Sequence, residues 1–235
     1  MKLKLLFLSA ALSVAAISYS FAQTADEVVA KYIQAKGGAD KIRTLTSTIM
    51  TGDINQGGMK IPVTMYAVQN KAFRVEFTFN GLTGYQIITD TSGWNFNPFA
   101  GQSKPERMTS DDIKSSQDQL ELQDDLLDYA AKGSTVEMLG KDDVEGTECY
   151  KLKLTLKSAK EKTLFISTAD NMLIKTSEKI TANGQEMESS TFLSNYKPVG
   201  PGVMMAFSIT NNLQGQVDIT NIEVNKDIDA AKFKP

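Results

Sequence analysis

Apolar and polar residues alternate with a period of two along most of this chain. The stretch FRVEFTFNG, residues 73–81, places four apolar side chains on one side of an extended backbone and polar side chains on the other. YKLKLTLK, residues 150–157, alternates tyrosine and leucine with lysine and threonine in the same way. Because successive side chains of a strand point to opposite faces, both stretches predict strands with one apolar face and one polar face.

The same pattern predicts strands over most of the remaining sequence. Their expected ranges are 45–53, 61–69, 85–90, 93–97, 135–140, 162–168, 172–180, 186–196, 203–211 and 216–224. Turn sequences separate them, the clearest being Asn183-Gly184, a dipeptide that favours two-residue hairpins. The intervals between strands are too short for the helical crossovers of a parallel sheet. The expected fold class is therefore mainly β, within α+β: a large, strongly curved antiparallel sheet covered by a few helices.

Helical signals occur at the start of this strand-rich region. Thr24 and Glu27 form a capping-box pattern before apolar residues that recur on one helical face. They predict a helix over 25–36, which the glycine pair at 37–38 ends. The sequence ADKIRTL, 39–45, predicts a further short helical turn.

A longer helix is expected over 110–132, with Thr109 or Ser110 as N-cap and Gly133 after its last turn. Its apolar residues form two nearly opposite stripes, which predicts contact on more than one side, as in a movable cover across the concave face of the sheet. The residues of this cover are Leu120, Leu122, Leu126 and Leu127. Its acidic residues favour a solvated face, with a docking surface for a basic partner as the alternative.

The N-terminal residues have the pattern of a secretory signal peptide. Two lysines precede an apolar run, and the small residues Ser20 and Ala22 stand before a cleavage point at Gln23. The strongly apolar part is shorter than the ~20 residues of a membrane-spanning helix, so cleavage is favoured over a membrane anchor. The expected organisation is a signal peptide over 1–22 and a single domain over 23–235, exported to the periplasm without a stable membrane anchor.

Charge and residue usage exclude several classes of function. The chain carries 25 basic and 28 acidic residues, and loss of the two N-terminal lysines leaves the mature chain with a formal charge of −5. An acidic chain without a basic cluster is a poor nucleic-acid binder, so no nucleic-acid partner is expected. Histidine is absent, which excludes Ser-His-Asp and Cys-His catalysis and the usual zinc sites.

The remaining candidates for catalysis are weak. Cys149 is the single cysteine and lies in an alternating strand pattern, which favours a small buried thiol over a nucleophile. An enzyme that uses carboxylates alone, such as a glycosidase, stays an alternative because acidic pairs occur at 111–112, 124–125 and 142–143. Acids in helices and turns usually face solvent, however. We expect no catalytic residue, no cofactor and no metal.

The apolar face of the sheet either forms a closed core or lines a cavity that holds an apolar ligand. Residue type alone favours a closed core, since aromatic and methionine side chains are usually buried. The scarcity of catalytic groups favours a binding role. Strand alternation places the following residues in a lipid cavity: Met65, Phe73, Val75, Phe77, Phe79, Trp94, Phe96, Leu152, Leu154 and Leu156.

Three stretches together resemble a known family. They are VVAKYIQAKGGADKIRTLTSTIMTG at 28–52, DVEGTECYKLKLTLKSAKEKTLFISTADNMLIKTSEK at 143–179 and TFLSNYKPVGPGVMMAFSI at 191–209. They resemble the exported outer-membrane lipoprotein-sorting proteins of Bacteroidetes-type bacteria, which are related to the periplasmic carrier LolA and the receptor LolB. The resemblance spans most of the chain after residue 22, and its motifs are hairpins and helix caps, not catalytic groups.

This resemblance implies an incomplete antiparallel β-barrel, a LolA-like half-barrel, with helices closing its open side over a hydrophobic cavity. It implies a periplasmic carrier that shields the acyl chains of a lipid or lipoprotein during transfer toward the outer membrane, with transfer partners at the inner or outer membrane. Each methylene removed from water is worth ~0.8 kcal/mol, so such a carrier needs an apolar cavity and no reactive group. The alternative is a non-catalytic envelope interaction or scaffold domain with a closed core.

Overall fold

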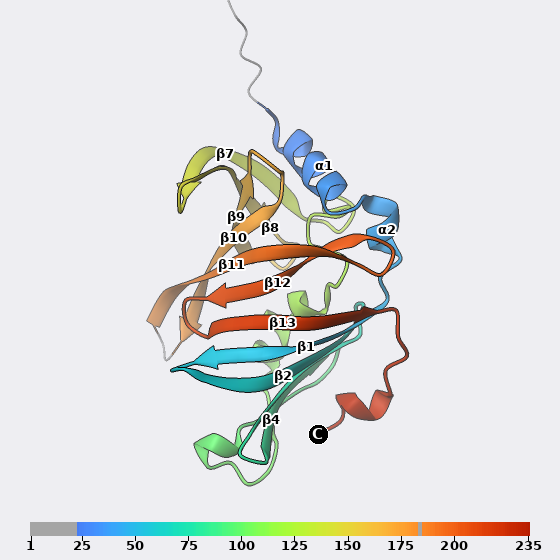
Figure 1. Cartoon of the computed structure of the whole chain (residues 1–235), viewed down its shortest axis with the longest axis vertical. Coiled ribbons are helices and arrows are strands. Elements are labelled where there is room, and N and C mark those ends of the chain that lie inside the picture. The colour runs from blue at the N-terminus through green and yellow to red at the C-terminus, as the bar shows by residue number, and fades with distance from the viewer. Residues whose placement is uncertain (1–22, 183–184) are drawn as a thin grey trace, which may run out of the picture.

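The computed structural model describes residues 23–182 and 185–235, and the expected signal peptide lies outside them. In this part the chain forms one antiparallel sheet of 13 strands (Figure 1). The first six strands are β1 (Ser47–Gln56), β2 (Met59–Val68), β3 (Ala72–Phe79), β4 (Leu82–Thr89), β5 (Gly93–Phe96) and β6 (Glu106–Arg107). The other seven are β7 (Thr135–Val144), β8 (Thr147–Thr155), β9 (Glu161–Ser167), β10 (Leu173–Ala182), β11 (Gln185–Val199), β12 (Val203–Asn211) and β13 (Gly215–Val224).

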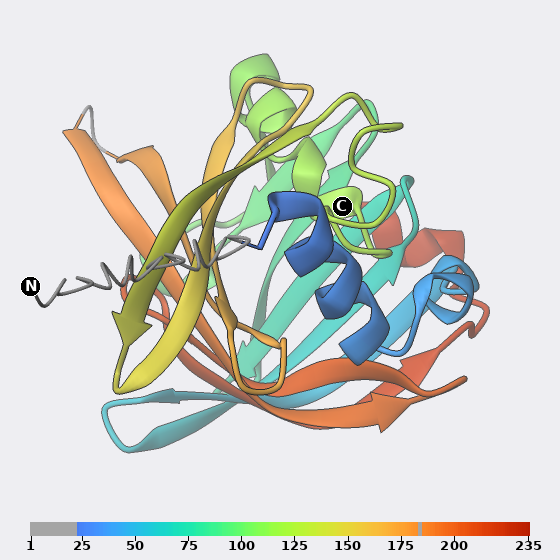
Figure 2. The ribbon, with the colours of Figure 1, turned by 90° about the horizontal axis from the view of Figure 1, so that it is seen from above.

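The sheet curls into an incomplete barrel, which confirms the expected fold class. Its strand order is β6-β5-β4-β3-β2-β1-β13-β12-β11-β10-β9-β8-β7, so β6 and β7 are the edges and β1 joins β13. The connection between β6 and β7 lies in the opening between these two edges (Figure 2). Alternation in the sequence predicted every strand except the two-residue β6. The expected turn at Asn183-Gly184 lies outside the described residues, while β10 and β11 pair up to Ala182 and Gln185.

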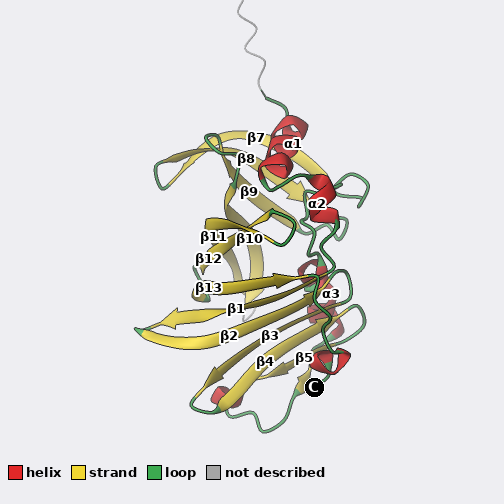
Figure 3. Cartoon of the chain, turned by 45° about the vertical axis from the view of Figure 1, so that its right-hand side comes forward, coloured by secondary structure: helices red, strands yellow, loops and turns green. Residues whose placement is uncertain are grey.

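Helices cover one end of the sheet and part of its inner side (Figure 3). The two helices before β1 are α1 (Ala25–Ala35) and α2 (Ala39–Arg43), as the sequence predicted. The predicted capping box is confirmed: Thr24 accepts from the backbone of Glu27, whose side chain accepts from the backbone of Thr24. The remaining short helices are η1 (Pro98–Ala100), α3 (Ser110–Ser115), η2 (Gln117–Leu120) and η3 (Ala230–Phe233).

The apolar face of the sheet lies on the inside of the curve. Residues directly opposite each other on antiparallel strands share a face. Met50 pairs with Met65 and Met65 with Val75, so this face continues across β1, β2 and β3. Polar pairs occupy the outer face, where Ser208 donates a hydrogen bond of 3.1 Å to Asp218.

A closed core lies beneath α1. The α1 residues Val28, Val29 and Tyr32 are buried. They pack against four buried residues of β8 and β9, namely Leu152, Leu154, Leu164 and Ile166. A second cluster joins α2 to β12 through Ile42 and Val203, so both helices are anchored to the sheet by apolar contacts.

The single helix predicted over 110–132 is wrong. Helical structure ends with η2, and the chain then continues in turns and irregular segments. Asp124 and Asp128 have φ values of 87° and 53°, a left-handed conformation that interrupts a right-handed helix. The Asp124 side chain accepts a hydrogen bond of 2.9 Å from the backbone of Leu126, so a side chain replaces a helical backbone bond. We call residues 116–133 the strap.

Candidate functional site

Five residues that the sequence placed in a cavity lie together on the inner face of β2 and β3. Met65 pairs with Val75, and Phe73, Phe77 and Phe79 lie on the same side of β3 as Val75. All five side chains are partly exposed. We call these five residues the inner apolar surface.

Phe99 extends the inner apolar surface, although no pattern in the sequence indicated this. Its ring stacks on Phe77 with centroids 5.7 Å apart and contacts Phe79 at 6.3 Å. Gly84 faces Phe77 from β4, and a Cβ at this glycine would meet the Phe77 ring at 2.7 Å. The missing side chain at Gly84 therefore leaves room for the phenylalanine. In the sequence, Phe99 stands in a turn containing proline and glycine, a context that does not indicate packing.

Three leucines from the same expected cavity belong to the closed core instead. Leu152 and Leu154 are completely buried beneath α1. Leu156 packs at the margin of that cluster and is partly buried. In this conformation α1 occupies the space above these residues, so a ligand on the inner apolar surface does not reach Leu152 or Leu154.

Trp94 and Phe96 do not join the inner apolar surface. Trp94 pairs with Ile87, which pairs with Arg74 on the outer face of β3. Phe96 contacts Tyr85 with ring centroids 5.5 Å apart on that same face. Alternation shows which residues of one strand share a face. Which of the two faces points inward depends on the register with the neighbouring strand, and the pattern does not determine that register.

The strap leucines contact two separate apolar clusters. Leu120, Leu126 and Leu127 are buried, and Leu122 is partly buried. Leu126 packs into the cluster beneath α1, whereas Leu122 and Leu127 pack into the cluster between α2 and β12. The two apolar stripes therefore belong to an irregular segment between two packed layers.

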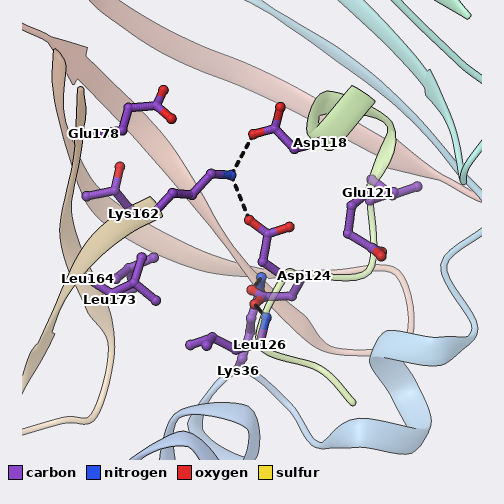
Figure 4. Close-up of a pocket in the computed structure, with 12 residues that line it drawn as sticks. Lys36, Asp118, Glu121, Asp124, Leu126, Lys162, Leu164, Leu173 and Glu178 are labelled. Carbon is purple, nitrogen blue, oxygen red and sulfur yellow. Dashed lines mark hydrogen bonds and ion pairs between the residues drawn. The ribbon is translucent and has the colours of Figure 1, made fainter. Parts of the chain in front are cut away.

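A cavity of about 340 Å³ with charged walls lies between the strap and the inner face of β9 and β10 (Figure 4). Lys162 Nζ lies 2.8 Å from Oδ2 of both Asp118 and Asp125. Lys160 Nζ lies 3.0 Å from Asp118 Oδ2 and 2.9 Å from Glu178 Oε2. These ion pairs connect the strap, which includes η2, to β9, to β10 and to Lys160 just before β9.

Burial and ion pairing act in opposite directions on this cluster. Burial disfavours the ionised form of Asp118, but Lys162 and Lys160 outweigh it and hold the pKa of this carboxyl below its usual range. At Asp125 burial outweighs the attraction of Lys162, so the pKa of this carboxyl is raised. Burial also opposes ionisation of Lys162, yet Asp125 and Asp118 together raise the pKa of its ammonium group.

A second network fastens the strap to α1. Lys36 and Asp124 form a buried ion pair, and the Tyr32 hydroxyl donates a hydrogen bond of 2.6 Å to Asp124 Oδ2. Burial opposes ionisation of Asp124, but Lys36 and then Tyr32 hold the pKa of its carboxyl below the usual range. Burial, followed by the charge of Asp124, raises the pKa of Tyr32.

The expectation that the acids of this segment form a solvated face is wrong for four of them. Asp118, Glu121, Asp124 and Asp125 turn inward, and lysines compensate their charges. Asp111 and Asp112, at the start of α3, are exposed as expected. The lysine partners of Asp118, Asp124 and Asp125 are distant in the sequence, and no local pattern marks them.

Comparisons with known proteins show the fold. No family model and no curated protein matches the sequence. A LolA superfamily protein from Nitrosomonas europaea is 15% identical, with a TM-score of 0.51 over 91% of this chain and 99% of that chain. An outer membrane lipoprotein-sorting protein domain from Vibrio parahaemolyticus is 12% identical, with a TM-score of 0.52 over 88% and 94%. The chain has a LolA-like fold.

A third solved structure agrees with this assignment. A DUF1329 family protein from Desulfovibrio piger is 12% identical to the present chain. The TM-score is 0.51, and the alignment covers 91% of the present chain and 98% of the Desulfovibrio piger protein. At such identities the similarity concerns the fold, so any statement about function has to be argued from the residues of this chain.

Two inner zones therefore share the LolA-like half-barrel: the inner apolar surface on β2 and β3, and the charged cavity beside β9 and β10. Within residues 23–182 and 185–235, acidic and cysteine side chains form no group suited to holding a metal ion. No helix in this part is both long enough and apolar enough to cross a membrane. Ion pairs in the walls of the charged cavity hold the strap to the sheet. The inner apolar surface is the candidate ligand site.

Proposed function

We propose that this protein is a periplasmic carrier that shields the acyl chains of a lipid or lipoprotein during transfer toward the outer membrane. One observation carries the proposal: the five residues of the inner apolar surface lie inside a LolA-like half-barrel and are still partly exposed. Burial of apolar area is worth roughly 25 cal/mol per Å², so an acyl chain laid along these side chains gains free energy by covering them.

Two solved structures of similar fold support a carrier role. One is a LolA superfamily protein and the other an outer membrane lipoprotein-sorting protein domain. Shielding an acyl chain requires apolar area and no catalytic group, and we propose that this protein is not an enzyme. Of the acidic pairs that an enzyme of the glycosidase type could use, the pair at 124–125 is engaged by lysines on two sides of the strap, Lys36 and Lys162.

Export is part of the proposal. A signal peptide over 1–22 would be removed near Ala22 and Gln23, leaving a single LolA-like domain over 23–235 in the periplasm. The partners in transfer would then lie at the inner and outer membranes. N-terminal sequencing of the exported protein tests this part, and an intact N-terminus on a chain that needs detergent would contradict it.

Uptake of a fluorescent fatty acid by the purified mature protein tests the carrier function. The wild type should bind the probe saturably. Phe77→Glu should abolish uptake, because a carboxylate deprived of water would face the acyl chain. Leu139→Glu is the matched control, since Leu139 is exposed on β7 and lies outside the inner apolar surface. Equal uptake by all three proteins would contradict the proposed site.

Phe77→Ala separates a ligand surface from a closed core. The change costs ~3–5 kcal/mol in a closed core. At the partly exposed Phe77 it should cost less, and probe affinity should fall by more than stability. If Phe77→Ala destabilises the fold as much as a core truncation and the wild type takes up no probe, the scaffold domain with a closed core becomes the better explanation.

A further inference from the structure

Exposed apolar side chains gather at one end of the sheet. Among the described residues, six large apolar side chains are between 40% and 52% exposed. Five of them lie at or beside hairpin tips or in η1: Met59, Leu82, Phe99, Met187 and Leu213. We call these five the rim residues. The sixth, Leu139, lies in the middle of β7.

Strand register places these tips at the same end. β1, β3 and β5 run in one direction, so the β1–β2 and β3–β4 hairpins and η1 all follow strands that finish there. Asn55 near the end of β1 pairs with Gln216 near the start of β13, which brings the β12–β13 hairpin to that end as well. The hairpins project away from α2 (Figures 1 and 3).

The tips carry positive charge in a chain whose net charge is negative. Four tip segments contain no aspartate or glutamate: 57–60, 80–83, 97–104 and 212–215. Two of their lysines, Lys60 and Lys104, are exposed. The hairpin between β10 and β11 differs, because Glu186 there forms an ion pair with Lys179.

The rim residues continue into the inner apolar surface. Leu82 pairs with Phe79, the last residue of β3. Phe99 contacts both Phe77 and Phe79. An apolar path therefore leads from the tips to the site proposed for acyl chains, on the side of the sheet that α1 and α2 leave open.

We propose that the rim residues dock this protein on a lipid bilayer with anionic head groups. Apolar side chains on separate, protruding tips suit insertion at the boundary of head groups and acyl chains, and nearby lysines are attracted to an anionic surface. A second copy of the chain fits less well, since a symmetric pairing through this rim would bring the same lysines together. The docking itself requires no bound lipid, so it goes beyond the proposed carrier function.

Vesicle binding tests the proposal. The wild-type mature protein should sediment with vesicles of phosphatidylcholine containing about a third phosphatidylglycerol, and more weakly with pure phosphatidylcholine vesicles. A triple variant, Met59→Ser, Leu82→Ser and Leu213→Ser, should bind the anionic vesicles at least about tenfold more weakly, because three apolar side chains no longer enter the interface. Leu139→Ser is the matched control and should bind as the wild type does.

A charge variant tests the second half of the argument. Lys60→Glu and Lys104→Glu together should weaken binding to the anionic vesicles and reduce its salt dependence, with little change for pure phosphatidylcholine. Circular dichroism establishes that each variant is folded. The proposal is overturned if the wild type does not bind vesicles, or if the triple serine variant binds them as tightly. A wild-type dimer that the serine variant abolishes would assign the rim to self-association instead.

The two proposals fail separately in these experiments. Phe77→Glu should lose uptake of the dissolved fatty-acid probe and still bind vesicles, because it leaves Met59, Leu82 and Leu213 intact. The triple serine variant should take up the dissolved probe normally. Loss of both activities in both variants would contradict the division between rim and inner apolar surface.

Discussion

Burying a charged side chain costs less free energy when a group of opposite charge lies beside it, and Lys162 has two such partners. It contacts Asp118 and Asp125, and Lys160 supplies a second positive charge to Asp118. Removing two charges from water costs several kcal/mol per ion, and their attraction offsets this cost only when the geometry is good. These ion pairs therefore fix where the strap lies more than they add to net stability.

Asp118 and Asp125 should respond differently to the same isosteric change. Asp118→Asn should lower the free energy of unfolding by roughly 1–3 kcal/mol at pH 7, because Asp118 serves two lysines. Asp125→Asn should change it by less than about 1 kcal/mol, since burial already raises the pKa of this carboxyl and the substitution removes that penalty. Urea unfolding of both variants provides the measurement, and equal losses would contradict this distinction.

The pH dependence of the two variants should have opposite sign. A carboxyl with a lowered folded-state pKa, such as Asp118, stabilises the fold above its unfolded pKa of ~3.9 and loses that contribution as the pH falls. The loss of unfolding free energy in Asp118→Asn, relative to the wild type, should therefore become smaller below about pH 4. Asp125 has a raised folded-state pKa, so it stabilises the fold at pH values below ~3.9 and loses that contribution as the pH rises. The free energy of unfolding of Asp125→Asn, relative to the wild type, should therefore increase between about pH 4 and pH 7. Thermal melts across this range measure both trends.

At the residue scale, the sequence predicts which side chains share a face and leaves their partners open. Alternation correctly grouped Phe73, Phe77 and Phe79, because the period of a strand is a local property. It gave no indication that Lys162 binds Asp125, which lies 37 residues earlier in the chain. Contacts of this kind arise only when the sheet has curled and brought β9 opposite the strap.

At the scale of elements, the strap depends on side chains for many of its hydrogen bonds. Gln69 Oε1 accepts from the backbone of Leu122 at 2.6 Å and of Gln123 at 3.2 Å. Its Nε2 donates to Glu121 Oε1 at 2.7 Å. Gln123 Nε2 in turn donates to the Leu45 carbonyl at 2.9 Å. A segment held in this way is expected to open more readily than a strand with hydrogen bonds on both sides.

Gln69→Ala should loosen the strap without unfolding the sheet. Amide hydrogen exchange at Leu122 should become faster, because this amide loses its acceptor, whereas the amide of Gln123 keeps Glu121 Oε1 at 2.9 Å and should change less. Exchange in β8 should stay slow, and added lipid should slow exchange in the strap of the wild type. Gln86→Ala is the control, since its amide group donates only to another side chain, that of Asn95. Equal protection of strap and β8 in every state would contradict a movable cover.

The same contrast explains which elements the sequence predicts. The helix at 25–36 was predicted correctly because its cap, apolar face and terminating glycines are all local signals. The helix at 110–132 was not, since its apolar stripes and acids are equally consistent with an irregular segment between two layers. The tertiary ion pairs of Asp118 and Asp124 determine the outcome, and they override local helical preference.

At the scale of the whole molecule, the segment that connects the two edge strands fills the gap between them. β6 and β7 do not pair with each other, and the strap lies in the opening between them, bound to β9 and α1. Short hairpin turns predict the meander from β1 to β5 and from β7 to β13, while the pairing of β1 with β13 has no local signal. This closure places α1 and α2 at one end and the rim residues at the other (Figure 3).

Ligand binding should stabilise the whole domain and thereby report where the ligand lies. A ligand that binds only the folded state adds ~2.7 kcal/mol at a concentration of 100 times Kd. For a domain of about this size, that corresponds to a rise of roughly 5–10 °C in the melting temperature of the wild type on addition of oleate. Phe77→Glu should show no rise, whereas the triple serine variant at Met59, Leu82 and Leu213 should show the full rise, because oleate reaches the inner apolar surface from solution. Calorimetry measures all three, and an equal rise in Phe77→Glu would place the ligand outside the inner apolar surface.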